Sequence, residues 1–208
     1  KGMMHFSGTP YAPSRPFEAR AQGVGMVFQH FSLFEALSVS ENIALGMNKE
    51  AVGADLDQQI TEVSDAYGLS LDPKRYVGSL SVGERQRGEI VRCLLQNPRL
   101  LIMDEPTSVL TPQEVEILFE TLRQLSSEGC SILYISHKLE EIRVLCDHAT
   151  VLRGGAVVGA CDPREETAKS LAEMMIGSTL TLTERKEAAF GDECLVVANL
   201  SVQNKDPF

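Results

Sequence analysis

LLIMDEPT, residues 100–107, is the stretch of sequence that decides the fold. Its first four residues form a short apolar run, as expected for a strand that is covered on both faces in a parallel sheet. Asp104 and Glu105 follow this run directly and therefore lie at the carboxyl end of the strand, where parallel α/β sheets bind their ligands. The pattern predicts a buried strand that presents two acids to a site.

The two acids are candidates for different chemical roles. Successive strand residues point to opposite faces, so Asp104 can hold Mg²⁺, directly or through water, while Glu105 orients and polarises a water. The alternative is a solvated strand end that passes into a turn at Pro106. This stretch alone leaves both interpretations open.

Other apolar runs alternate with amphipathic stretches, which is typical of an α/β fold. Residues 24–28 and 131–135 are further strand candidates, and residues 149–153 and 156–159 form an expected hairpin around Gly154-Gly155. The sequence therefore predicts layers of helices packed on a largely parallel sheet.

Helix starts are marked by a recurring spacing of a hydroxyl residue and a glutamate three positions later. In such a capping box each side chain binds the backbone amide of the other residue. The spacing occurs at Ser38 and Glu41, Ser81 and Glu84, and Thr111 and Glu114. Asp162 and Glu165 repeat the logic for a helix that is expected to end at Gly177.

Composition and charge exclude several classes of function. Among 208 residues, 43% are hydrophobic, and 29 acidic residues against 19 basic ones give a formal net charge of −10. This balance disfavours nucleic-acid binding, which grows with the number of positive contacts to phosphate. Five cysteines without a C-x-x-C pair predict free thiols in the cytosol, not a disulfide scaffold or a zinc site. No apolar run approaches the length needed to span a bilayer.

Three other positions are candidate site residues with simpler alternatives. Ser81 and Gly83 begin a helix and leave amides at its positive end, which favours an anion, although the capping box is complete without one. Gln29 ends a strand and can offer an oxygen to a metal or a contact to water, or it is a plain polar edge residue. His137 can hydrogen-bond a phosphate, or it is a surface residue at a helix start.

In this order along the chain, Gln29, LSVGE (80–84), DEPTS (104–108) and Ser136-His137 resemble the nucleotide-binding cassette of ABC transporters. The resemblance implies an α/β fold of the ABC-type P-loop NTPase class, with a RecA-like core and a helical subdomain. It also implies ATP and Mg²⁺ as cofactors.

The resemblance assigns a role to each matching residue. Gln29 corresponds to the Q-loop and, with Asp104, to the Mg²⁺ site, and Glu105 corresponds to the catalytic carboxylate. His137 corresponds to the switch histidine. The signature residues contact ATP bound by the opposite cassette, and they are Ser81, Val82, Gly83 and Glu84. Ser108 corresponds to the D-loop and is a further cofactor-binding residue.

Finer details resemble the two-cassette ATPases of bacterial simple-sugar and nucleoside importers. These details are GMVFQHF (25–31), SVLTPQE (108–114) and SHKLEE (136–141). The resemblance implies transmembrane permease subunits and a second cassette as partners, and a substrate-binding protein indirectly. It implies a cytoplasmic location, peripheral on the inner face of the cell membrane.

No stretch of the sequence matches the phosphate-binding loop G-x-x-x-x-G-K-[ST]. The resemblance then predicts an N-terminally truncated fold, with residues 1–177 as a first cassette lacking its P-loop part. Residues 178–193 are expected to be a linker, and residues 194–208 the first strand of a second, truncated cassette. We expect apolar surface to be exposed beside the 100–103 strand, and the chain alone to be inactive in ATP hydrolysis.

Two alternative functions remain open at this stage. A soluble ABC-type ATPase working on nucleic acid or ribosomes is disfavoured by the acidic balance and by the short interval between Gln29 and Ser81. A non-enzymatic partner module would supply only the signature motif to another cassette. It is disfavoured because Glu105 and His137 are both present.

Overall fold

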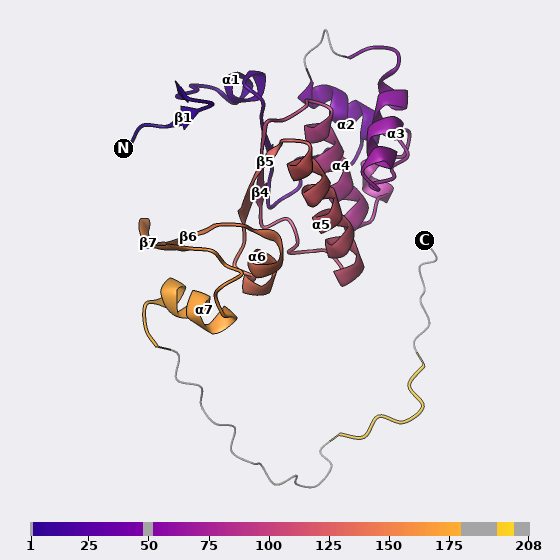
Figure 1. Ribbon diagram of the computed structural model, residues 1–208. Coiled ribbons are helices and arrows are strands. Elements are labelled where there is room, and N and C mark those ends of the chain that lie inside the picture. The colour runs from indigo at the N-terminus through magenta and orange to yellow at the C-terminus, as the bar shows by residue number, and fades with distance from the viewer. Residues whose placement is uncertain (1, 48–51, 180–194, 202–208) are drawn as a thin grey trace. The chain divides into compact units, whose positions relative to one another are not determined.

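The computed structural model describes residues 2–47, 52–179 and 195–201. The chain divides into two units, residues 1–178 and residues 179–208, and each is described by itself. The first unit contains all of the helices and strands found among the described residues (Figure 1). It mixes a parallel sheet with packed helices, which confirms the predicted α/β class.

The first unit is organised around a three-stranded parallel sheet of order β3-β4-β5. Its strands are β3 (Val24–Val27), β4 (Leu100–Asp104) and β5 (Ser131–Ile135). Met103 in β4 pairs with Val27 on one side and Tyr134 on the other, so β4 is the central strand. All three strands were predicted from their apolar runs, and all three are confirmed.

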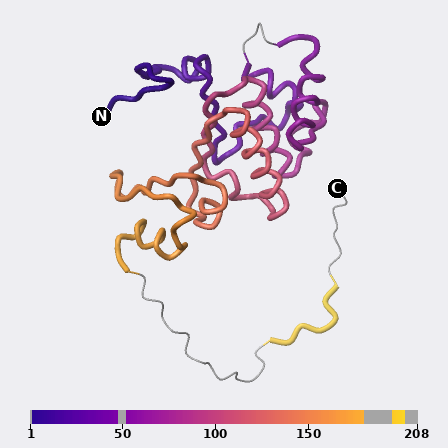
Figure 2. The backbone as a smooth tube through the Cα atoms, in the orientation of Figure 1, coloured from indigo at the N-terminus to yellow at the C-terminus, as the bar shows by residue number. Residues whose placement is uncertain are grey.

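Helices cover one face of this sheet and form the core with it. α4 (Val82–Leu94) packs on β3, and α5 (Pro112–Ser127) packs on β5, while α2 (Val39–Gly46) and α3 (Leu56–Ala66) contact α4 (Figure 2). Leu101 and Met103 of β4 are completely buried under these helices. Ile90 and Leu122 belong to the same hydrophobic cluster.

The other face of the sheet exposes apolar side chains on β5. Leu133 and Ile135 are 50% and 43% exposed, and they alternate with the half-buried Ile132 and Tyr134. Apolar exposure was expected beside residues 100–103, but β4 has a neighbour on each side. The exposure falls on Leu133 and Ile135 because strand alternation turns them to the face opposite Ile132 and Tyr134, which belong to the core side.

The remaining elements of the first unit are short. They are β1 (His5–Phe6), β2 (Thr9–Pro10), α1 (Pro16–Ala21), η2 (Val77–Ser79), α6 (Leu139–Leu145), β6 (Ala149–Arg153), β7 (Ala156–Cys161) and α7 (Ala168–Ile176). β6 and β7 form the predicted antiparallel hairpin, and Gly154 and Gly155 both have positive φ in its turn. In the described part of the chain, no helix combines the length and apolarity that a bilayer crossing demands.

The three predicted capping boxes are all present. α2, α4 and α5 begin after Ser38, Ser81 and Thr111, and in each case both reciprocal hydrogen bonds with the glutamate are formed. The fourth predicted helix start is wrong. α7 begins after Thr167, which forms a capping box with Ser170, and only its predicted end at Gly177 is confirmed.

Asp162 does not cap a helix because its carboxylate is used two residues further on. It accepts hydrogen bonds from the Arg164 amide at 3.0 Å and from the Arg164 guanidinium Nε at 2.9 Å. Such a contact favours a turn over a helix start. Hydrogen bonding from Arg164 lowers the pKa of Asp162 to about 2.

The strand expected within residues 194–208 is absent from the described part of the second unit. Leu195–Ser201 has no strand geometry, and Cys194 and Val202 lie outside the described residues. A strand needs a partner for its backbone amides and carbonyls, and no strand pairs with these seven residues. Most of the expected linker, residues 180–193, also lies outside the description, so the domain boundaries stay a prediction.

Candidate functional site

The two acids lie at the carboxyl edge of the sheet, as predicted. Asp104 is the last residue of β4, and Glu105 follows it with a left-handed backbone, φ = 46°. The Glu105 amide donates a 2.9 Å hydrogen bond to the Ile135 carbonyl of the neighbouring strand. Glu105 has therefore left the strand alternation, and its direction is set by a conformation that costs a non-glycine residue roughly 1–2 kcal/mol.

Glu105 and His137 form a direct pair across the two strand ends. The Glu105 Oε1 lies 2.7 Å from the His137 Nδ1, with the carboxylate 25% exposed and the ring 65% exposed. An ionised carboxylate only accepts, so Nδ1 is the donor and Nε2 remains for another partner. α6 begins at Leu139, so His137 precedes the helix instead of opening it.

Gln29 lies at the same edge of the sheet but does not join the pair. It follows β3 by two residues, as Glu105 follows Met103, and Val27 is the register partner of Met103. Its side chain is exposed, and among the described residues no hydrogen bond connects it to Asp104, Glu105 or His137. The edge therefore brings together a carboxamide, two carboxylates and an imidazole.

The expected signature residues form a second, separate group at the start of α4. Ser81 Oγ accepts from the Glu84 amide at 3.2 Å, and Glu84 Oε2 accepts from the Ser81 amide at 2.8 Å. This box leaves the amides of Val82 and Gly83 without a partner among the described residues. They are the free donors that an anion at this helix end would meet.

Arg75 forms an ion pair with Glu84 of this group. Its guanidinium lies 2.5 Å from Glu84 Oε1. Partial burial of Glu84 acts to raise its pKa, but the hydrogen bonds from the Ser81 amide and from Arg75 outweigh this and lower it. Glu84 therefore stays ionised and holds the helix start, instead of facing a ligand itself.

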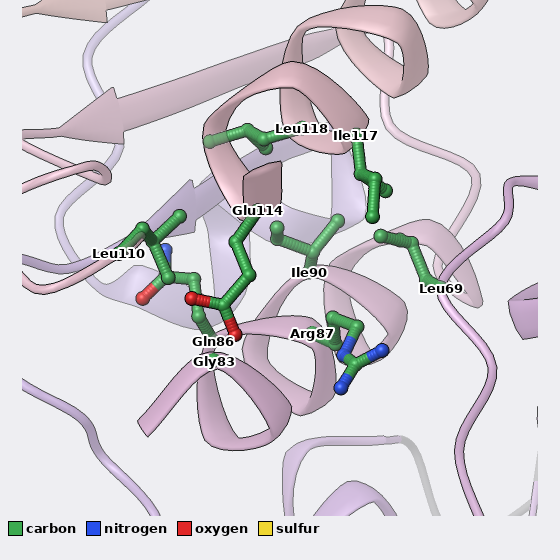
Figure 3. A pocket seen from close by; sticks show the side chains of 9 residues that line it. All are labelled: Leu69, Gly83, Gln86, Arg87, Ile90, Leu110, Glu114, Ile117 and Leu118. Carbon is green, nitrogen blue, oxygen red and sulfur yellow. The ribbon is translucent and has the colours of Figure 1, made fainter. Parts of the chain in front are cut away.

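A pocket lies behind the signature group, between α4 and α5 (Figure 3). Glu114 reaches from α5 toward Gly83, so closely that a Cβ added at Gly83 would lie 1.6 Å from Glu114 Oε1. Within the described residues, Gln86 Nε2 and Arg87 Nε are buried without a hydrogen-bond partner. The close approach of Glu114 gives a physical reason for glycine at position 83.

Ser108 is exposed beside the carboxyl edge of the sheet, and its amide donates to the Glu105 carbonyl at 3.3 Å. In the described structure, no hydrogen bond or ion pair connects residues 81–84 with Glu105 or His137. The chain thus presents two half-sites, one at the sheet edge and one at the start of α4.

The carboxyl edge fits Mg²⁺ better than a metal held by protein alone. No cluster of three His, Cys, Asp or Glu residues suited to a metal occurs among the described residues. Mg²⁺ typically binds one or two protein ligands, with phosphates and water completing its shell. Asp104 with Gln29 matches that requirement in ligand type.

Sequence analysis missed a buried group directly behind the Glu105–His137 pair. Thr107, Tyr134, Lys138 and Glu141 form a connected network of hydrogen bonds there. One signal could have found it. Strand alternation puts Tyr134 on the same face as Ile132, and a tyrosine hydroxyl turned toward a core needs a partner.

Comparison with solved structures defines the class of fold. The chain resembles an ATP-binding cassette of an ABC transporter in its ADP conformation, with a TM-score of 0.71 at 22% identity over 86% of this chain and 78% of that one. It also resembles cbiO1 from Clostridium perfringens, part of the ABC transporter complex cbiONQ, with a TM-score of 0.64 at 25% identity over 83% and 68% of the two chains. The fold is therefore an ABC-type P-loop NTPase fold.

The chain belongs to the ABC transporter family, whose model matches residues 1–108. It is 39% identical to the nucleoside import ATP-binding protein NupA of Lactococcus lactis subsp. cremoris, covering 98% of this chain and 41% of that protein. It is also 39% identical to a ribose import ATP-binding protein of Rubrobacter xylanophilus, covering 96% and 41%. The chain thus spans about two fifths of the length of the curated relatives it matches.

Proposed function

We propose that this chain forms part of an ATP-hydrolysing subunit that powers the import of simple sugars or nucleosides. The observation that carries the proposal is the Glu105–His137 pair at the carboxyl edge of a parallel sheet, 2.7 Å apart. A glucose import ATP-binding protein of Haloferax volcanii, 36% identical over 96% of this chain and 42% of that protein, supports the sugar side of the proposal. The nucleoside import ATP-binding protein of Lactococcus lactis supports the nucleoside side of the proposal.

The chemistry proposed for the sheet edge is hydrolysis of ATP bound with Mg²⁺. Asp104 and Gln29 would hold the metal, which would neutralise charge on the phosphates. Glu105 orients and polarises the attacking water, and its left-handed backbone aims the carboxylate away from the strand. His137 is oriented through Nδ1 by Glu105 and presents Nε2 to the γ-phosphate.

The start of α4 is proposed to act on a different nucleotide. The free amides of Val82 and Gly83, together with Ser81, contact ATP held by the opposite cassette. Glu84 acts indirectly by fixing the helix start through its capping box. Ser108 contributes from the turn after Glu105. Within this chain the start of α4 and the sheet edge are separate groups of residues, which supports the proposal that they contact different nucleotides.

The partners and location follow from the same proposal. Residues 1–177 act as a first cassette, residues 178–193 as a linker, and residues 194–208 as the start of a second cassette in a polypeptide of the relatives' length. The subunit is peripheral on the cytoplasmic face of the membrane, bound to permease subunits that receive substrate from a binding protein. The net charge of −10 agrees with a partner other than nucleic acid.

The chain by itself is proposed to hydrolyse ATP at a negligible rate. None of its 208 residues forms the phosphate-binding loop, so little holds the triphosphate beside Glu105. A phosphate-release assay on the purified chain with ATP and Mg²⁺ tests this directly. Turnover comparable to that of an intact import ATPase would contradict it.

The decisive experiment uses Glu105→Gln in a polypeptide of the relatives' length that contains this sequence. We expect loss of phosphate release at this site by a factor of about 10² or more, with ATP binding retained, because the variant keeps size and loses only the basic oxygen. Glu140→Gln is the matched control, since Glu140 is exposed and pairs with Arg143 on α6. Unchanged phosphate release in Glu105→Gln would overturn the assignment.

A further inference from the structure

Four polar side chains form a compact network behind the Glu105–His137 pair. The Thr107 hydroxyl lies 2.8 and 2.7 Å from the two carboxylate oxygens of Glu141, and the Tyr134 hydroxyl donates to Glu141 Oε2 at 2.7 Å. The Lys138 ammonium lies 3.2 Å from Glu141 Oε1. One carboxylate therefore gathers contacts from three side chains.

The Thr107–Glu141 centre of the network is shielded from water, which makes its hydrogen bonds costly to break, whereas the Lys138 side chain is 40% exposed. Thr107 is 1% exposed, and the Glu141 side chain is 13% exposed. Burial, and then the hydrogen bond to Glu141, raise the pKa of Tyr134 well above its ordinary value, so its hydroxyl stays a donor. A buried carboxylate with several donors is strongly held in one position.

The network joins the two segments that carry the pair. Thr107 follows Glu105 by two residues, and Lys138 follows His137 directly. Lys138 Nζ also donates to the Thr107 carbonyl at 2.9 Å and lies 3.1 Å from its hydroxyl, so side chain and backbone are both held. Glu141, in the first turn of α6, contacts both Thr107 and Lys138.

Glu105 needs such support because its backbone conformation is unfavourable. A left-handed glutamate persists only where surrounding contacts over-determine it. The Glu105 backbone itself makes two hydrogen bonds, from its amide to the Ile135 carbonyl and from the Ser108 amide to its carbonyl. The contacts to Thr107 add constraints two residues further along the same turn. They act on the Glu105 segment and on the His137 segment together.

We propose that Glu141 is a positioning residue, which holds Glu105 and His137 at hydrogen-bonding distance through Thr107 and Lys138. The catalytic meaning of this role rests on the function proposed above, but the geometry itself does not. Among the described residues, no hydrogen bond or ion pair joins Glu141 to Glu105 or His137, so its effect is transmitted through the two segments.

The test observes the pair without any hydrolysis. The imidazole ¹⁵N signals of His137 are recorded in the ¹⁵N-labelled chain by long-range ¹H–¹⁵N correlation, and Glu105→Gln gives the reference for a pair without its carboxylate. We expect Glu141→Gln to move the His137 Nδ1 signal most of the way to that reference. The Gln side chain keeps the size but replaces one acceptor oxygen by a donor facing Thr107, Tyr134 and Lys138.

Glu140→Gln on the same helix is the matched control, and it is expected to leave the His137 signals unchanged. A folded Glu141→Gln chain with wild-type His137 signals would overturn the proposal. If that variant does not fold, Thr107→Val decides in its place, since it keeps the shape and removes the hydroxyl that contacts Glu141. The His137 signals are recorded without ATP. The positioning role of Glu141 can therefore be confirmed or overturned whether or not the proposal of ATP hydrolysis holds.

Discussion

At the scale of single residues, Gly83 and Gly88 show how position within one helix decides what a methyl group does. A Cβ at Gly83 would overlap the carboxylate of Glu114, whereas a Cβ at Gly88 would meet only Leu33 Cδ1 at 3.8 Å, an ordinary contact. Glu114 cannot move freely, because Thr111 donates to its Oε2 from both amide and hydroxyl at 2.9 Å.

We therefore expect opposite effects of the two alanine substitutions on the free energy of unfolding. Gly88→Ala gains helix propensity and stabilises the chain by about 0.5–1 kcal/mol. Gly83→Ala displaces Glu114, loses most of the α5 cap and strains the α4–α5 contact, which costs about 2 kcal/mol relative to Gly88→Ala. Urea denaturation of both variants measures the difference.

Glu114→Ala provides the internal check on that comparison. It removes the overlapping carboxylate, so the difference between the Gly83→Ala and Gly88→Ala variants is expected to shrink in its background. An undiminished difference would assign the cost to the backbone of α4 instead of Glu114.

At the scale of elements, Asn42 on α2 organises the segment between β3 and its own helix. Its Oδ1 accepts from the Phe34 amide at 2.7 Å, and its Nδ2 donates to the carbonyls of Phe34 at 3.0 Å and Ser38 at 2.9 Å. The side chain is 3% exposed. This segment follows Gln29, so its order bears on the proposed metal site.

Asn42→Asp is expected to destabilise the chain by about 1–3 kcal/mol, because an ionised carboxylate cannot donate to buried carbonyls and repels them. The matched control is Asn97→Asp at an exposed position with φ = 48°, which aspartate tolerates. The measurement is the shift in denaturation midpoint for both variants. Equal shifts would refute the role given to the Asn42 amide.

The elements also show what local sequence can predict here. Capping boxes after Ser38, Ser81 and Thr111 were predictable because both partners lie within four residues. The start of α7 was not predictable from spacing. Asp162 could pair with Glu165 in a capping box or with the charged side chain of Arg164, and it pairs with Arg164. The spacing of residues along the sequence indicates which local contacts are possible. The relative strength of these contacts decides which one forms.

The candidate site also combines features that the sequence predicts with features that it does not. The position of Glu105 at the carboxyl end of a strand was predicted, since parallel α/β sheets carry their ligand sites there, whereas its pairing with His137 was not. The left-handed turn at Glu105 and the network around Glu141 depend on contacts between β4, β5 and α6, which no periodicity encodes. Nor does sequence alone reveal that Glu114 lies against Gly83 from another helix.

At the scale of the whole molecule, acid should weaken the fold through five carboxyl groups. Hydrogen bonds lower the pKa of Glu18, Glu41, Glu84, Glu128 and Asp162, in the first two cases chiefly from the amide at the helix start. A lowered folded-state pKa adds stability that is present above the ordinary carboxyl pKa and is lost as pH falls through the folded value.

We therefore expect the thermal midpoint to fall between about pH 5 and pH 2, the lower limit being set by Asp162 at about 2. Net charge acts in the same direction over this range, because the isoelectric point is near 4.9 and protonation below it builds up positive charge that repels itself. Repeating the series at high salt screens that repulsion and isolates the carboxyl effect. A midpoint that rises steadily toward low pH in high salt would contradict the prediction.

Tyr67 and Glu128 extend the pH argument to alkaline conditions and connect distant parts of the first unit. Tyr67 ends α3 and Glu128 ends α5, and the Tyr67 hydroxyl donates to Glu128 Oε2 at 2.5 Å. Burial, and then this hydrogen bond, raise the pKa of Tyr67 to about 12, while the same bond lowers the pKa of Glu128. The pair is therefore stable only where the phenol is protonated and the carboxylate is ionised.

Tyr67→Phe should remove a contribution at both ends of the pH range. A raised folded-state pKa gives stability that is complete below the ordinary tyrosine pKa of about 10 and is lost as pH rises toward 12. We expect the difference in thermal midpoint between wild type and Tyr67→Phe to be largest near neutral pH and to narrow in both acid and alkali. Tyr76→Phe is the matched control, because Tyr76 is 62% exposed. A pH-independent difference would mean that Tyr67 stabilises α3 and α5 through packing of its ring, and that the hydroxyl contributes little.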